Sequence, residues 1–177
     1  PEQDKNTMTV VVRYADGDPI AKDRIAGLYD LGQRIQALPD VLRVESPFHL
    51  DPRALGRTSL TAADLEALYT TPRERLPEAL QVALRQAVGT HIVVFNVLSA
   101  QPKLAPEAQT LVKAIRALAP PPGAEVLVTG LTAFDIDVVD FIVSRTPAAI
   151  VWVMAATYVV LFFLLGYALY SALFAAV

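Results

Sequence analysis

The sequence contains no cysteine and only two histidines. Without cysteine the chain can form no disulfide scaffold and no metal site built on thiolates, and the redox state of its compartment stays open. His49 and His91 stand 42 positions apart, and no spacing typical of metal ligands surrounds either of them. We therefore expect both histidines to be structural, and we predict no metal ion and no cofactor.

Short catalytic motifs are also missing. The sequence has no Gly-x-Ser-x-Gly, no phosphate-binding loop and no His-Glu-x-x-His. Nothing in it pairs a nucleophile with a base, and an enzyme would need convergent polar groups in the middle of the chain. We predict that the chain is not an enzyme and has no catalytic residue.

No basic cluster occurs anywhere in the sequence. The 15 basic and 18 acidic residues give a net charge of −3, and Arg13, Arg43 and Arg53 are scattered. This excludes the electrostatic footprint of a nucleic-acid-binding protein. It also excludes a polybasic segment that grips anionic lipid headgroups.

Charge disappears after Arg145. Residues 146–177 contain no Asp, Glu, Lys, Arg or His. About 20 apolar residues suffice to cross the hydrocarbon core of a bilayer, whereas a buried helix of a soluble protein rarely stays apolar for so long. We predict a transmembrane helix at residues 146–177.

This predicted span carries few polar side chains, namely Thr157, Tyr158, Tyr167, Tyr170 and Ser171. The later tyrosines are typical of interfacial anchors, and a threonine in a helix can hydrogen-bond to its own backbone. An intramembrane carboxylate would indicate a proton relay, and the span has none.

Two similar units precede the span. Residues 7–14 are rich in β-branched side chains, residues 23–38 show a helical apolar period, and residues 41–46 alternate between apolar and charged. Residues 92–98, 104–118 and 125–129 repeat this order of strand, helix and strand. A constant shift of 83 positions superposes Val10 on Val93, Leu28 on Leu111 and Val44 on Leu127.

Two βαβ units in tandem predict an α+β fold, the ferredoxin-like split βαβ sandwich of four antiparallel strands with two helices on one face. Its first and third strands are central, and here they are the most apolar. The second and fourth carry Arg43, Glu45, Pro47 and Glu125, as edge strands do. We assign residues 1–130 to this domain.

Residues 49–90 interrupt the domain as a helical insert. Thr61 and Asp64 have the spacing of a capping box for a helix at 62–69. Pro77 precedes a second helix, in which Leu76, Leu80 and Leu84 recur every four residues. We expect the insert to form a flap beside the sandwich, with a cleft lined by apolar side chains along residues 60–88.

Residues 131–145 read as an amphipathic juxtamembrane helix, and Pro147 as the kink or the start of the transmembrane helix. Asp135, Asp137 and Asp140 would suit a cation or proton site, although a solvated helix face explains them better. Asp16 and Asp18, on either side of Gly17, could be a pair of loop ligands. Turn chemistry accounts for them fully.

The order of these segments resembles the MMPL branch of the RND transporter superfamily. The sequence from Gly130 reads Gly-Leu-Thr-Ala-Phe-Asp-Ile-Asp, Arg145 is followed by Thr-Pro, and residues 157–166 read Thr-Tyr-Val-Val-Leu-Phe-Phe-Leu-Leu-Gly. The Leu-Tyr-Asp-Leu of residues 28–31 and the strand at 41–46 are also similar to the porter subdomain of that family. The likeness covers nearly the whole chain through order and spacing.

The resemblance implies a bacterial inner-membrane exporter of lipids or other hydrophobic molecules that is driven by the proton gradient. Residues 1–145 would lie on the extracytoplasmic side and contribute to the substrate path. The partners would be the bilayer, the remaining transmembrane helices and a second porter domain of the same transporter. The proton-carrying residues of the family lie on other helices, so no site residue is implied here, and the substrate-path residues stay unknown.

Two other classes of protein stay open. One is a single-span, membrane-anchored binding or sensor domain, and the other is an accessory module of a protein-export machine. Because the sequence begins with proline, we expect it to be a piece of a longer protein. Further spans in the neighbouring reading frame would favour the transporter.

Overall fold

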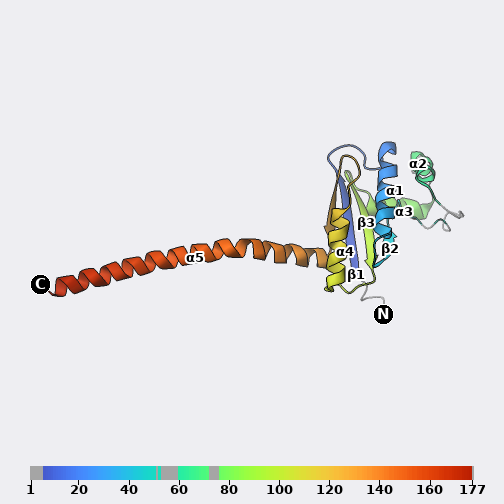
Figure 1. Ribbon diagram of the computed structural model, residues 1–177. Coiled ribbons are helices and arrows are strands. Elements are labelled where there is room, and N and C mark those ends of the chain that lie inside the picture. The colour runs from blue at the N-terminus through green and yellow to red at the C-terminus, as the bar shows by residue number, and fades with distance from the viewer. Residues whose placement is uncertain (1–5, 51, 53–59, 72–75, 177) are drawn as a thin grey trace. The chain divides into compact units, whose positions relative to one another are not determined.

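The computed structural model describes residues 6–50, 52, 60–71 and 76–176, and the fold is α+β (Figure 1). In chain order the elements are β1 (Asn6–Tyr14), α1 (Lys22–Gln36), β2 (Val41–Glu45), α2 (Ala62–Thr70), α3 (Glu78–Ala87), β3 (Ile92–Ser99), α4 (Pro106–Ala117), β4 (Ala124–Thr129) and α5 (Leu131–Ala175). They form two compact units, Pro1–Asp135 and Ile136–Val177. Arg53 lies outside the described residues.

The strands form one antiparallel sheet in the order β2-β3-β1-β4. Val10 of β1 pairs with Phe95 on one side and with Val128 on the other, and Val44 of β2 pairs with Val97. The two most apolar strands are therefore central and the two charged ones are at the edges. This confirms the placement expected from the edge preference of charged residues.

One face of the sheet is fully buried. Strand residues alternate between the two faces, and paired residues share a face. The buried residues of the strands therefore lie together on this face: Met8, Val10, Val12, Tyr14, Val44, Val93, Phe95, Val97 and Val128. The helices add their own buried side chains: Ile25, Leu28, Leu31 and Ile35 from α1, and Ala108, Leu111, Val112 and Ile115 from α4. These residues make up the hydrophobic core.

The other face of the sheet is partly open to solvent. Val11 and Val94 are half-buried at its centre, and Leu127 is exposed beside them. Arg13 donates to Glu125 across this face at 2.6 Å between Nη2 and Oε2. Alternation of apolar and polar residues is the expected pattern for a sheet covered on one side only.

The insert is helical, as predicted, and packs against the sandwich. The capping box of α2 is present, because the Thr61 side chain accepts from the backbone of Asp64 while the Asp64 carboxylate accepts from the backbone of Thr61. The Tyr29 hydroxyl on α1 donates to the carbonyl of Leu60 at 3.0 Å. The ring of Phe48 also packs against the ring of Tyr69 on α2, with the centroids 5.3 Å apart.

The helix α5 runs without a break through 45 residues. The sequence predicts that Pro147 kinks the helix or starts the transmembrane helix; it lies inside α5, so the second of these expectations is wrong. Proline removes the backbone donor that would bond to the carbonyl of Val143. Two hydroxyls bond to neighbouring carbonyls of the same turn: Ser144 donates to that of Phe141 at 3.0 Å, and Thr146 to that of Ile142 at 2.6 Å.

The first turn of α5 is fastened to the sheet by buried polar groups. Asn6 at the start of β1 donates from Nδ2 to Oγ1 of Thr132 at 3.1 Å, and Thr132 donates to the carbonyl of Lys103 at 2.6 Å. Gly130 turns the chain into the helix with a φ of 130°, and a Cβ there would lie 3.5 Å from the Cα of Met8. A side chain would be strained at Gly130.

Candidate functional site

A cleft of about 390 Å³ lies between the partly open face of the sheet and α3. Its walls come from β2 and the following turn, from β3 and from one side of α3; the lining residues are Arg43, Val44, Glu45, Ser46, Pro47, His49, Leu50, Ala83, Gln86, Ala87, Val94 and Asn96. The strand register explains this grouping, because Arg43 pairs with Leu98 and Glu45 with Asn96. Residues paired in this way point to the same face.

The lining of the cleft is mixed. Arg43 and Glu45 form an ion pair, and Asn96 accepts at 3.3 Å from the hydroxyl of Thr9. Val94, Ala83 and other small apolar groups supply the rest. A cleft beside the insert is present, as the sequence predicted, but the expectation that apolar side chains along residues 60–88 line it is wrong, because the lining is mixed and only Ala83, Gln86 and Ala87 of that range contribute. Such a surface suits an amphiphile, with an apolar portion on the helix side and a polar portion at the strand edge.

His49 stands where the cleft meets a second, smaller hollow of about 220 Å³ under α2. Within the described residues its Nδ1 atom is buried and has no hydrogen-bond partner. Burial disfavours the charged imidazolium, and this lowers the pKa of His49 from its ordinary value. Partial burial thus favours the neutral imidazole of His49 over the charged one.

The half-buried His49 should make the domain sensitive to acid. Its folded pKa is lowered, so the unfolded chain binds a proton first as the pH falls through about 6.5. Stability should therefore decline below that pH, with a slope of at most about 1.4 kcal/mol per pH unit from this group. Urea unfolding of His49→Gln and wild type between pH 7.5 and 5 measures the difference in slope. The exposed His91→Gln is the control, and a wild-type slope unchanged by His49→Gln would contradict the assignment.

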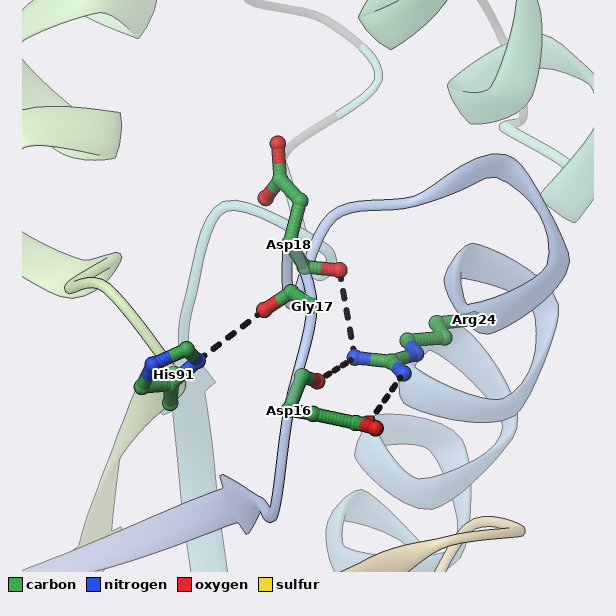
Figure 2. A network of polar contacts seen from close by, with 5 residues as sticks. All are labelled: Asp16, Gly17, Asp18, Arg24 and His91. Carbon is green, nitrogen blue, oxygen red and sulfur yellow. Dashed lines mark hydrogen bonds and ion pairs between the residues drawn. The ribbon is translucent and has the colours of Figure 1, made fainter.

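The pair Asp16 and Asp18 belongs to a polar network at the turn after β1, shown in Figure 2. The guanidinium of Arg24 donates to the backbone carbonyl of Asp16 at 2.8 Å and to that of Asp18 at 3.3 Å, and it lies 3.5 Å from the Asp16 carboxylate. The Asp18 carboxylate accepts from the backbone of Ile20 at 3.0 Å. His91 reaches the carbonyl of Gly17 through Nδ1 at 3.1 Å.

These contacts identify the network as a turn held in place. Gly17 has a φ of 72°, which the turn requires. Arg24 also lies over the ring of Tyr14, 4.3 Å from its centroid. Burial raises the pKa of Tyr14, although the positive charge of Arg24 acts in the opposite direction. The structure thus supports the turn interpretation of Asp16 and Asp18.

The acidic residues at the start of α5 do not assemble a cation site. Asp135 accepts from the side chain of Gln109 at 3.4 Å, and Asp140 is exposed. Across residues 6–50, 52, 60–71 and 76–176 there is no group of three His, Asp or Glu side chains that could hold a metal ion. The structure therefore offers no support for a cation site at Asp135, Asp137 and Asp140.

Polar residues later in α5 are mostly exposed along the helix. The hydroxyl of Thr157 donates to the carbonyl of Val153 at 2.8 Å, which confirms that it bonds to its own helix. Tyr158, Tyr167 and Tyr170 are each more than 60% exposed. By length and composition α5 can cross a membrane.

Comparison with known protein-family models finds no match, and comparison with curated protein sequences finds none. The resemblance to the MMPL branch therefore rests on the sequence segments quoted for it alone.

Sequence reasoning missed several of the residues that define the candidate site. Asn96 and Gln86 looked like ordinary polar positions on a strand and a helix, and Glu45 was noted only as an edge charge. Arg24 carried one usable signal, since a basic residue in the first turn after an acidic loop is well placed to bind that loop. The cleft residues carried no such local signal.

Proposed function

We propose that the chain is a porter domain, together with the membrane helix that follows it, from a proton-driven transporter of the RND/MMPL type. Its role is to supply part of the extracytoplasmic path along which lipids or other hydrophobic molecules are exported. The observation that carries this proposal is the strand order β2-β3-β1-β4, followed directly by a long apolar helix.

The strand order supports a ferredoxin-like split βαβ repeat. The antiparallel pairs β1–β3 and β2–β3 make β1 and β2 parallel, with β3 between them. The pairs β1–β3 and β1–β4 likewise make β3 and β4 parallel, with β1 between them. Each βαβ unit is thus split by a strand of the other, as the fold requires.

The charges that flank the apolar stretch of α5 support an extracytoplasmic domain. Arg145 is the single basic residue in Leu131–Ala175, and three aspartates accompany it. Cytoplasmic flanks of membrane helices carry an excess of Lys and Arg. In this proposal the membrane is the inner membrane of a bacterium, and the first unit lies outside it.

The cleft supports a role in guiding an amphiphile. Its volume of about 390 Å³ falls within the range of about 300–1,000 Å³ that ligand sites occupy. The chemical step of proton coupling lies elsewhere in this proposal, because residues 146–177 have no carboxylate and no histidine. This domain binds and releases, while other helices of the transporter carry protons.

Lipid labelling from single cysteines tests the path, and the absence of native cysteine makes each label unique. Ala83→Cys faces the cleft, whereas Val82→Cys is its neighbour on α3 and does not line it. The whole transporter in vesicles that contain a maleimide-bearing phospholipid should label faster at position 83 than at position 82. Equal labelling at both positions would remove the cleft from the substrate path.

A further inference from the structure

The apolar part of α5 is longer than the hydrocarbon core of a bilayer. Its charge-free stretch, Thr146 to Ala175, spans 30 residues, and at about 1.5 Å per residue this is roughly 45 Å of helix. The hydrocarbon core is about 30 Å thick, or about 40–45 Å with the headgroups. Part of the apolar helix must therefore lie outside the hydrocarbon, and its side chains indicate which part.

The charged end of the apolar stretch lies at Arg145. Its guanidinium turns back along the helix to the ring of Phe141, 5.6 Å from the centroid, and so away from the apolar stretch. From Arg145 to Ala175 the rise is about 45 Å, which equals the whole bilayer including headgroups. Because a charged side chain is costly in hydrocarbon, Arg145 belongs in the headgroup layer or outside it.

Aromatic residues divide the remaining helix into a core and two borders. Tryptophan and tyrosine collect at the two membrane–water interfaces. Trp152 and Tyr170 are exposed and 18 residues apart, which is about 27 Å along the axis. This separation matches the hydrocarbon thickness. The span from Trp152 to Tyr170 encloses Tyr158 and Tyr167. A span of the same length that began at Tyr158 instead would bury Tyr170 and Ser171 in addition to Tyr167.

We propose that α5 crosses the hydrocarbon core between about Trp152 and Tyr170, and that its first part as far as Pro147 lies outside that core. This inference rests on the proposed function, in which α5 spans the membrane, and it adds the depth at which each part of α5 lies in the bilayer. Phe141, Ile142 and Val143 are each more than half exposed, and they stand above the hydrocarbon layer. In this proposal only the part of α5 from Trp152 to Tyr170 contacts the hydrocarbon core of the bilayer.

The single tryptophan of the chain reports this depth directly. The chain is reconstituted in vesicles of phosphatidylcholine that carry a nitroxide on the headgroup, near the headgroup end of the acyl chain, or near the bilayer centre. Trp152 fluorescence should be quenched most by the second probe. In a Trp152→Phe background, Phe162→Trp should be quenched most by the central probe, with emission shifted to the blue, because it lies about 15 Å further along the helix.

Phe141→Trp in the same background completes the set, and its emission should respond to a quencher in the water. Strongest quenching of Trp152 by the central probe would overturn the proposed depth while leaving a membrane span. Strongest quenching of Trp152 by the headgroup probe would favour the span that begins at Tyr158. Indifference of both Trp152 and Phe162→Trp to all three lipid probes would instead overturn the membrane span itself.

Discussion

Replacing Phe95 by alanine is expected to lower the free energy of unfolding of the first unit by about 3–5 kcal/mol. Phe95 is fully buried on the central strand β3, and its ring lies 6.4 Å from that of Phe48. Its Cε1 atom would lie 3.5 Å from a Cβ at Gly32, so α1 closes over it. Removal of the ring leaves a cavity in a core that cannot collapse around it. Pulse proteolysis in urea measures the loss.

The matched control lies on the other face of the same sheet. Leu127 on β4 is 42% exposed, and Leu127→Ala should cost well under half of the Phe95 value, since most of its surface stays in water. A loss at position 127 as large as that at position 95 would mean that the buried face has been wrongly assigned. Because domains are stable by only about 5–15 kcal/mol, Phe95→Ala should also reduce the amount of folded protein.

Placing an arginine at Val160 is expected to weaken membrane insertion of α5 by about 3–4 kcal/mol. An arginine at the centre of a membrane helix costs about 2.5–3.5 kcal/mol, whereas a valine there contributes about −0.3 to −0.6 kcal/mol. Val160 lies near the middle of the proposed span from Trp152 to Tyr170 and is exposed on the helix. The fraction inserted in a microsome glycosylation assay measures the change.

Phe141→Arg is the control for this charge, because Phe141 lies four residues before Arg145 and outside the proposed hydrocarbon band. It should insert almost as well as the parent helix. Equal losses at positions 141 and 160 would show that the charge penalty does not depend on depth, which contradicts a span centred near Val160.

The secondary structure follows closely from the sequence, because each element has a strong period of its own. The strands and helices begin and end within a few residues of the predicted limits. The placement of β2 and β4 at the edges also follows, since charges such as Arg43 and Glu125 are tolerated best there. Pro147 is the exception. A proline suggests a kink or the start of a helix, yet α5 is a single helix that contains Pro147.

The candidate site was less accessible to prediction. A position for the insert beside the sandwich could be expected, but the cleft lining depends on strand register and on which side of α3 faces the sheet. The register pairs Glu45 with Asn96, and no local pattern in either segment reveals this. The burial of His49 is likewise a tertiary property, because its neighbour Gly32 is 17 positions earlier in the chain.

The position of β1 in the middle of the sheet determines how late in biosynthesis the sheet can be completed. Val10 pairs with Phe95, 85 residues later, and with Val128, 118 residues later. At about 5–20 residues per second, the ribosome needs roughly 6–24 s to deliver the second partner. Until β3 is made both edges of β1 are unpaired, and one edge stays unpaired until β4 follows. The strand contains a run of three valines, a composition prone to aggregation. In the nascent chain the edges of residues 6–14 are therefore open to pairing with other chains until β3 and β4 have been made.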